Sequence, residues 1–118
     1  MSRVKGGVTS KRRHNKLLKA VKGYRMTRGT LVKVAKESFL HAGQYAYMGR
    51  KLRKRDMRKL WIIRLNAAAH LVGLPYNKLI SGLKKANIEL DRKILASIAF
   101  DDFKTFETIA TQAKGALG

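Results

Sequence analysis

The chain has 118 residues, of which 27 are basic and 7 acidic, so its formal net charge is +20; it contains no cysteine. Disulfides, thiolate metal sites and cysteine nucleophiles are therefore excluded, and no apolar run is long enough to cross a bilayer. Residues 1–60 hold 19 of the basic residues and two acidic ones, a net charge of +17, whereas residues 61–118 carry +3. Burying so many unpaired cations would be prohibitive. We therefore expect a polyanionic partner, most commonly nucleic acid.

This charge gradient predicts two parts: a basic helical extension over residues 1–60 and a small helical globular domain over residues 61–118. A domain of about 60 residues buries only about 60% of its unfolded surface and is marginally stable by itself. The like charges of the extension repel one another, so we expect it to become fully ordered only against its partner.

Apolar residues recur at three- and four-residue spacing and Pro75 is the single proline, which predicts an all-α fold. Ser10 and Thr30 are candidate N-caps, and Gly23 and Gly73 are candidate stop signals. The expected helices, in chain order, are 11–22 after Ser10, 31–72 after Thr30, 76–86 ending at Asn87, 92–99 after Asp91, and 102–115 capped by Asp101 or Asp102.

One face of the long second helix changes from cationic to apolar along its length. The cationic part of this face holds Arg50, Lys54 and Arg58, and the apolar part holds Trp61, Leu65, Ala68 and Val72. The apolar part should close a four-helix core with Leu79, Ile80, Leu83, Ile94, Leu95, Ile98, Phe103, Phe106, Ile109 and Ala110. The other basic residues of this helix point in nearly every direction, which favours a surrounding of phosphates over an ordinary solvated charged helix.

Arginine offers a planar fork to phosphate oxygens and lysine a point charge, while exposed aromatic rings can stack on unpaired bases. We expect Tyr47 to contact bases, Tyr45 to pack on its own helix face, and Trp61 to lie at the edge of the globular domain. The predicted RNA-binding residues are Arg3, Lys5, Lys11, Arg12, Arg13, His14, Lys16, Lys19, Lys22, Tyr24, Arg25, Arg28, Lys33, Lys36, Gln44, Tyr47, Arg50, Lys51, Arg53, Lys54, Arg55, Arg58, Lys59 and Arg64.

Nothing in the sequence indicates catalysis, a metal site or a cofactor. His14, His41 and His70 lack companions at ligand spacing. No paired carboxylates, nucleophile–base arrangement or glycine-rich phosphate loop is present. We therefore expect a protein that is not an enzyme.

Two other interpretations fit parts of the pattern. A DNA-compacting protein would have a similar composition, because phosphates are alike in both nucleic acids, although no apolar face remains for dimerisation. A membrane-active cationic segment is suggested by the first helix, whose apolar stripe is Leu17, Leu18 and Val21. That stripe is short and lacks an aromatic anchor, so we do not expect membrane binding. Because no apolar face remains for dimerisation, we do not expect a homo-oligomer either.

Several motifs resemble the bacterial-type large-subunit ribosomal protein L20 family, in collinear order over essentially the whole chain. These motifs are Gly43-Gln-Tyr-Ala-Tyr47, Arg53-Lys-Arg-Asp56, Arg58-Lys-Leu-Trp-Ile62, Arg64-Leu-Asn-Ala-Ala-Ala69, Gly82-Leu-Lys-Lys-Ala86 and Asp91-Arg-Lys-Ile-Leu-Ala96. The chain departs from the family at Met48-Gly49, where Arg-Asp is usual, and at Arg25-Met26, where an aromatic residue and glycine are usual.

The resemblance implies a basic helical arm that binds large-subunit ribosomal RNA, a small α-helical body docked beside neighbouring large-subunit proteins, and a role in early subunit assembly. It places the chain in the cytoplasm on a bacterial ribosome, with an organellar ribosome as the alternative. Some family members also bind their own messenger RNA, which makes translational autoregulation a further expectation.

Overall fold

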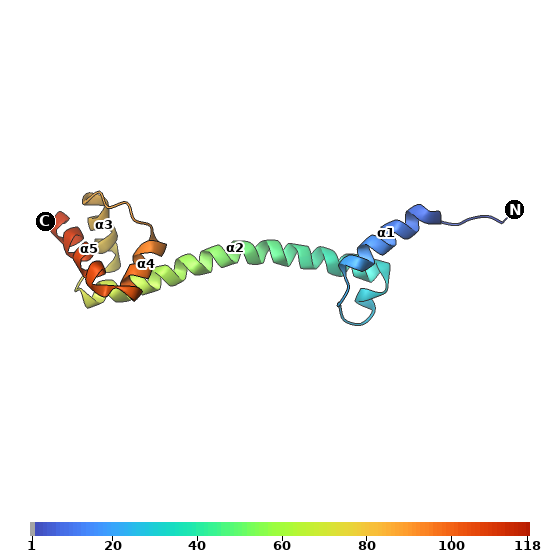
Figure 1. The fold of residues 1–118 in the computed structure, drawn as a ribbon, viewed down its shortest axis with the longest axis horizontal. Helices are drawn as coiled ribbons and strands as arrows, with labels where there is room; N and C mark the ends of the chain where they lie inside the picture. Colours follow the sequence, from blue (N-terminus) through green and yellow to red (C-terminus); the bar gives the residue numbers. More distant parts are fainter. Residues whose placement is uncertain (1) are drawn as a thin grey trace. The chain divides into compact units, whose positions relative to one another are not determined.

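A computed structural model of the chain, which describes residues 2–118, has helices as its only regular elements in that range and no strand (Figure 1). Its elements are α1 (Gly7–Ala20), the 3₁₀ helix η1 (Met26–Gly29), α2 (Val32–Leu71), α3 (Tyr76–Lys85), α4 (Arg92–Asp101) and α5 (Phe103–Ala116). The predicted all-α fold, with a long basic helix followed by a small helical cluster, is confirmed.

By its internal contacts the chain divides into two compact units, Met1–Lys51 and Leu52–Gly118, and α2 contributes residues to both. The predicted boundary after residue 60, between a basic helical extension and a small globular domain, stays a prediction.

In the N-terminal unit, α1 begins at Gly7 and not at residue 11. Gly6 and Gly7 have φ values of 86° and 65°, in the region that favours glycine. Ser10 lies inside the first turn and does not cap the helix, so that prediction was wrong. The end was predicted well: Gly23 has a φ of 91°, three residues after the last helical residue.

The loop between α1 and α2 contains η1, which periodicity did not predict because it is a single short turn. The Thr30 hydroxyl hydrogen-bonds back to the Thr27 carbonyl oxygen at 3.4 Å. It therefore does not cap α2 as expected. The Leu31 amide also donates to Thr27, at 2.8 Å. Val21, at the start of the loop, and Ala35, in the first turn of α2, are fully buried and form the centre of this small unit.

Helices α2 and α3 both end in the same hydrogen-bond pattern, the Schellman motif. After α2, the Leu74 amide donates to Ala69 at 2.9 Å and Gly73 has a φ of 81°. After α3, the Ile88 amide donates to Leu83 at 3.0 Å and Asn87 has a φ of 55°. Gly and Asn are the residues that tolerate this left-handed position best, which is why both ends were predictable.

The C-terminal unit is built on a core to which α2, α3, α4 and α5 all contribute. Its fully buried side chains include Leu65, Leu79, Leu95 and Phe106, one from each helix. The predicted four-helix core is thereby confirmed, and Trp61 is partly buried at its margin, as expected. Ile94 was predicted to face the core but is 46% exposed. Ala96, which was not predicted to face the core, is buried there with Leu95.

Aspartates begin the last two helices. Asp91 accepts a hydrogen bond from the Ile94 amide at 2.8 Å at the start of α4. Asp102 accepts one from the Thr105 amide at 3.3 Å and thereby caps α5. Asp101, the alternative cap for α5, instead accepts a hydrogen bond from the Ser97 hydroxyl at 3.0 Å within α4.

Candidate nucleic-acid interface

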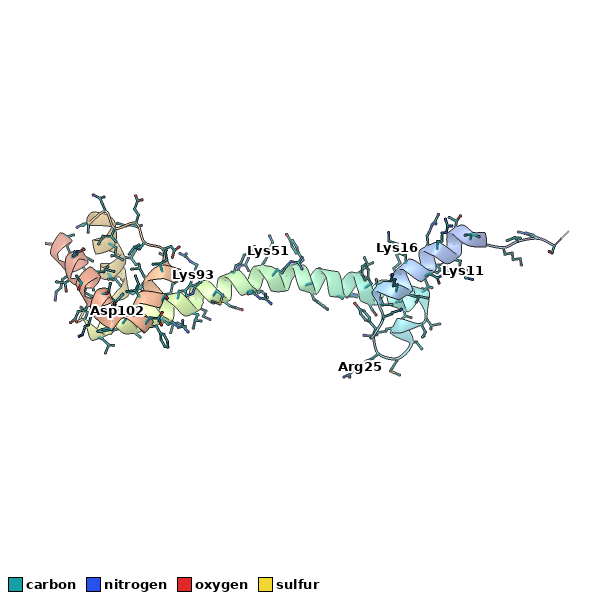
Figure 2. All side chains as sticks on the ribbon, in the orientation of Figure 1. Lys11, Lys16, Arg25, Lys51, Lys93 and Asp102 are labelled. Atoms are coloured by element: carbon teal, nitrogen blue, oxygen red, sulfur yellow. The ribbon has the colours of Figure 1, made fainter. Side chains whose placement is uncertain are left out.

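A continuous stretch of α2 has no buried side chain. Every residue from 43 to 60 is exposed, and no charged or polar side chain is buried anywhere among residues 2–118. Figure 2 shows Lys51 projecting from this stretch and Lys11 and Lys16 projecting from α1. Helices normally gain most of their stability by packing an apolar face. A stretch of several turns without a buried side chain gains little from packing, so it must be stabilised by something outside the chain or remain marginal.

The cations are not neutralised within the chain. Within the described part of the chain, no hydrogen bond joins a Lys or Arg side chain to a carboxylate. Among residues 2–118, the one hydrogen bond that a basic side chain donates runs from Arg92 Nε to Tyr76 Oη, at 2.9 Å. Like charges three or four residues apart on a helix destabilise it by about 0.2–0.5 kcal/mol per pair. The exposed stretch therefore carries a repulsion that a polyanion would relieve.

The predicted RNA-binding residues are distributed over every element of the N-terminal half. All of them are exposed apart from Tyr24, which is half-buried. Arg3 and Lys5 precede α1, and six lie on α1: Lys11, Arg12, Arg13, His14, Lys16 and Lys19. Four lie in the following loop and η1: Lys22, Tyr24, Arg25 and Arg28. Twelve lie on α2: Lys33, Lys36, Gln44, Tyr47, Arg50, Lys51, Arg53, Lys54, Arg55, Arg58, Lys59 and Arg64.

Two basic side chains lie over aromatic rings. Lys51 Nζ is 4.9 Å from the centroid of the Tyr47 ring, and the Arg64 guanidinium carbon is 5.5 Å from that of Phe100. Such cation–π contacts are worth about 0.5–1 kcal/mol at exposed sites. They hold the cation at a defined place without removing its charge, so both groups stay available to phosphate.

Tyr45 differs from its prediction. It was expected to pack on its helix face, but it is 71% exposed and stacks on His41, with ring centroids 6.0 Å apart and an interplanar angle of 26°. Leu31, which shares this helix face, is also exposed, at 53%. Helix periodicity places residues on a face, but it does not say whether another element covers that face.

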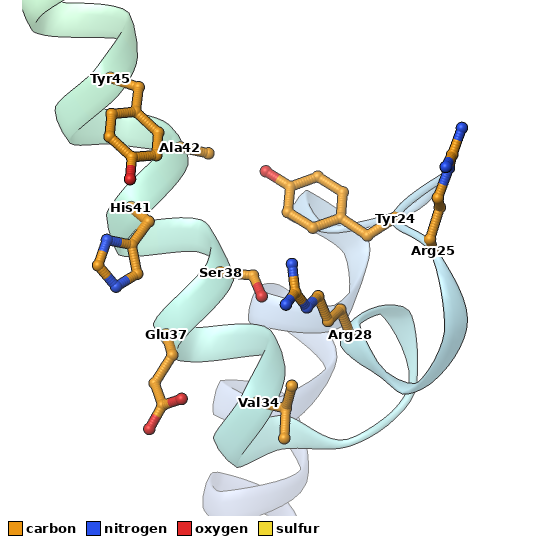
Figure 3. A pocket seen from close by; sticks show the side chains of 9 residues that line it. All are labelled: Tyr24, Arg25, Arg28, Val34, Glu37, Ser38, His41, Ala42 and Tyr45. Atoms are coloured by element: carbon orange, nitrogen blue, oxygen red, sulfur yellow. The ribbon is translucent and has the colours of Figure 1, made fainter.

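A pocket of about 620 Å³ lies in the N-terminal unit, between the α1–α2 loop and the first turns of α2 (Figure 3). Tyr24, Arg25 and Arg28 line it from the loop and η1, and all three were predicted RNA-binding residues. The α2 side of the pocket was not predicted. Its lining residues there are Val34, Glu37, Ser38, His41, Ala42 and Tyr45.

Across residues 2–118, no group of three or more His, Cys, Asp or Glu side chains is arranged to hold a metal ion. Within the same residues, none of the helices has both the length and the apolar character needed to cross a membrane.

Comparison with known proteins agrees with the motifs. Residues 3–109 match the family model described as ribosomal protein L20. The large ribosomal subunit protein bL20 of Legionella pneumophila (strain Corby) is 56% identical over 117 residues, which cover 99% of this chain and 98% of that protein. The proteins of the same name from Albidiferax ferrireducens and Kosmotoga olearia are 51% and 50% identical, over 99% and 98% of this chain and 98% of each relative. The chain belongs to the ribosomal protein L20 family.

Proposed function

We propose that the chain is a structural component of the large subunit of a bacterial ribosome and that it binds large-subunit ribosomal RNA through its exposed basic residues. The three relatives named above are about half identical to it over nearly their whole length and carry the name of a large-subunit protein. Members of this family are structural components and not enzymes, which agrees with the absence of any catalytic pattern in the sequence.

The observation that carries the proposal is the stretch from residue 43 to residue 60, which is helical, strongly basic and without a buried side chain. An α-helix of this kind can lie between RNA segments and screen phosphates that would otherwise repel one another. Each neutralised phosphate releases condensed counterions, so contacts with about six to ten phosphates predict a log–log salt slope of roughly −5 to −9.

Two finer roles follow from this mechanism. A cation-rich helix that lets RNA segments pack side by side would act while the subunit is assembling, which supports a part in early assembly. The same surface would also bind a similarly folded segment of the protein's own messenger RNA, so we include translational autoregulation in the proposal.

Neighbouring large-subunit proteins are the partners that we propose for the C-terminal unit. It keeps large apolar side chains at its surface: Leu71 and Phe100 are each 77% exposed and Ile63 is 57% exposed. Leu71 and Phe100 line the same surface pocket, and contiguous exposed apolar groups of this kind are typical of protein contact sites.

Competition between structured large-subunit ribosomal RNA and duplex DNA at fixed salt tests the proposal against its main alternative, DNA compaction. We expect the ribosomal RNA to displace the DNA at equal phosphate concentration. Equal competition by the two would favour a general polyanion binder. Co-sedimentation with large subunits through a high-salt gradient, followed by loss on RNA digestion, provides the second readout.

A further inference from the structure

We propose that the pocket beside the α1–α2 loop binds a single unpaired nucleotide of RNA, with the base stacked at Tyr45 and the phosphate held by Arg28. The inference rests on the proposed RNA-binding function and adds a specific site to it. Because the pocket lies wholly within the N-terminal unit, all of its walls belong to one compact part of the chain.

The pocket has the size and the walls of a small-ligand site. Its volume of about 620 Å³ falls within the range of about 300–1,000 Å³ that is usual for such sites. Tyr24 and Arg28 point from the loop toward α2, where Ser38 and Ala42 face them, while Arg25 is turned away (Figure 3). A planar group that enters between the loop and α2 would therefore meet aromatic, cationic and hydroxyl groups.

The loop that forms one wall is held in place by its own backbone. The Tyr24 amide donates to the Val21 carbonyl oxygen at 3.1 Å, and Val21 is fully buried. A Cβ atom added to Gly29 would lie 3.2 Å from the Tyr24 carbonyl oxygen, so this turn is closely folded. The wall is preformed, which lowers the ordering cost of binding.

Stacking is available at the α2 wall. Tyr45 is 71% exposed although it lines the pocket, and its stack on His41 is the one ring contact recorded for it among the described residues. Bases of single-stranded RNA stack on such rings regardless of sequence, whereas the bases of a duplex are already stacked on one another.

The polar groups of the pocket suit the two ends of a nucleotide. In the described structure Arg28 and Ser38 make no side-chain hydrogen bond, so the guanidinium and the hydroxyl remain available. Glu37 is the sole acidic residue among the first 55 residues, and it lines this pocket. A carboxylate repels phosphate but accepts hydrogen bonds from a base amino group, such as N4 of cytosine. The site should therefore prefer cytosine to uracil, which presents an acceptor at that position.

The experiment compares full-length protein binding to three RNAs of equal length at fixed salt: oligocytidylate, oligouridylate and a duplex. We expect Tyr45→Ala to weaken oligocytidylate binding about fivefold or more and to change duplex binding less than twofold. The salt slope should be unchanged, because no charge is removed. Tyr45→Phe should retain affinity. Phe39→Ala removes an exposed aromatic ring of α2 that does not line this pocket and should change oligocytidylate binding less than twofold.

Glu37→Ala removes the carboxylate proposed to accept a hydrogen bond from the cytosine amino group, so it should abolish the preference for oligocytidylate over oligouridylate. Equal losses on single-stranded and duplex RNA in Tyr45→Ala, or no loss on either, would overturn the nucleotide site. So would a wild-type protein that binds duplex RNA and neither single strand, which would leave the proposed function intact. A wild-type protein that binds none of the three RNAs would overturn both.

Discussion

Gly82 of α3 lies directly against the backbone of Ala113 in α5. A Cβ atom added at Gly82 would stand 2.8 Å from the Ala113 carbonyl carbon and closer still to its oxygen. Both residues are buried, so the two helices touch through their backbones at this point. Leu79 of α3 and Phe106 of α5 belong to the same buried core, and the close approach at Gly82 lets the two helices share it.

Gly82→Ala should therefore destabilise the C-terminal unit even though alanine is the better helix former. The new methyl group meets main-chain atoms, which cannot rotate aside, so we expect a loss of about 1–3 kcal/mol in the free energy of unfolding. Gly115→Ala in α5 is the matched control, because a Cβ there meets nothing within 4 Å. In chemical denaturation, the free energy of unfolding of Gly115→Ala should equal or exceed that of the wild type. A Gly82→Ala protein as stable as the wild type would show that the helices can separate at no cost.

Met26 occupies a backbone position suited to glycine. Its φ is 54° and its side chain is 90% exposed, so it gains little from packing. The L20 resemblance indicates glycine as the usual residue here. Met26→Gly should relieve strain of about 1 kcal/mol and raise the amide protection of the α1–α2 loop in hydrogen exchange.

Arg25→Gly is the control for this change, because Arg25 has an ordinary extended φ of −73° and gains nothing from glycine. It should lower protection of the loop through the added backbone entropy. If both variants changed the amide protection of the loop in the same direction, the positive φ of Met26 would not explain the effect of Met26→Gly.

The stabilisation that Asp102 gives to the start of α5 depends on pH. The Thr105 hydroxyl, and then the Thr105 and Lys104 amides, donate hydrogen bonds to its carboxylate and hold its pKa below the ordinary value of 3.8. Because the native state favours the charged form, the stabilisation is complete above pH 3.8 and is lost as the pH falls through the lowered native pKa.

Asp102→Asn keeps an acceptor for the Thr105 amide but removes the charge. Its thermal midpoint should therefore lie below that of the wild type near neutral pH, and the difference should shrink as the solution becomes more acidic. Asp102→Ala should be lower than both at neutral pH, since it removes the cap as well. A difference between wild type and Asp102→Asn that stays constant down to pH 2 would contradict this assignment.

Arg53, Lys54 and Arg55 lie in the middle of the exposed stretch of α2. Replacing all three by alanine should weaken binding to large-subunit ribosomal RNA and make the log–log salt slope shallower by about 2 to 3 units. The matched control replaces Lys78, Lys84 and Lys85 of α3, which are equally exposed but outside the predicted RNA-binding set. An unchanged slope in the first variant would mean that its three cations face solvent.

The sequence predicted a helix, or a helix end, wherever neighbouring residues alone determine it. Apolar spacing located α2 to within one residue at each end, and Gly73 and Asn87 marked the two left-handed stops. The start of α1 was missed because Gly6 offers no capping side chain. The α2 wall of the pocket was also missed, because it depends on where the loop over residues 21–31 folds against α2. The pocket brings together residues from different segments of the chain, and apolar periodicity within a helix does not predict such contacts.

Amide hydrogen exchange of the full-length protein, with and without large-subunit ribosomal RNA, tests the central claim most directly. In the free protein residues 43–60 have no buried side chain and should exchange quickly, and bound RNA should slow their exchange strongly by screening the repulsion between their cations. Protection by RNA that is confined to residues 61–118, with residues 43–60 unchanged, would contradict the account.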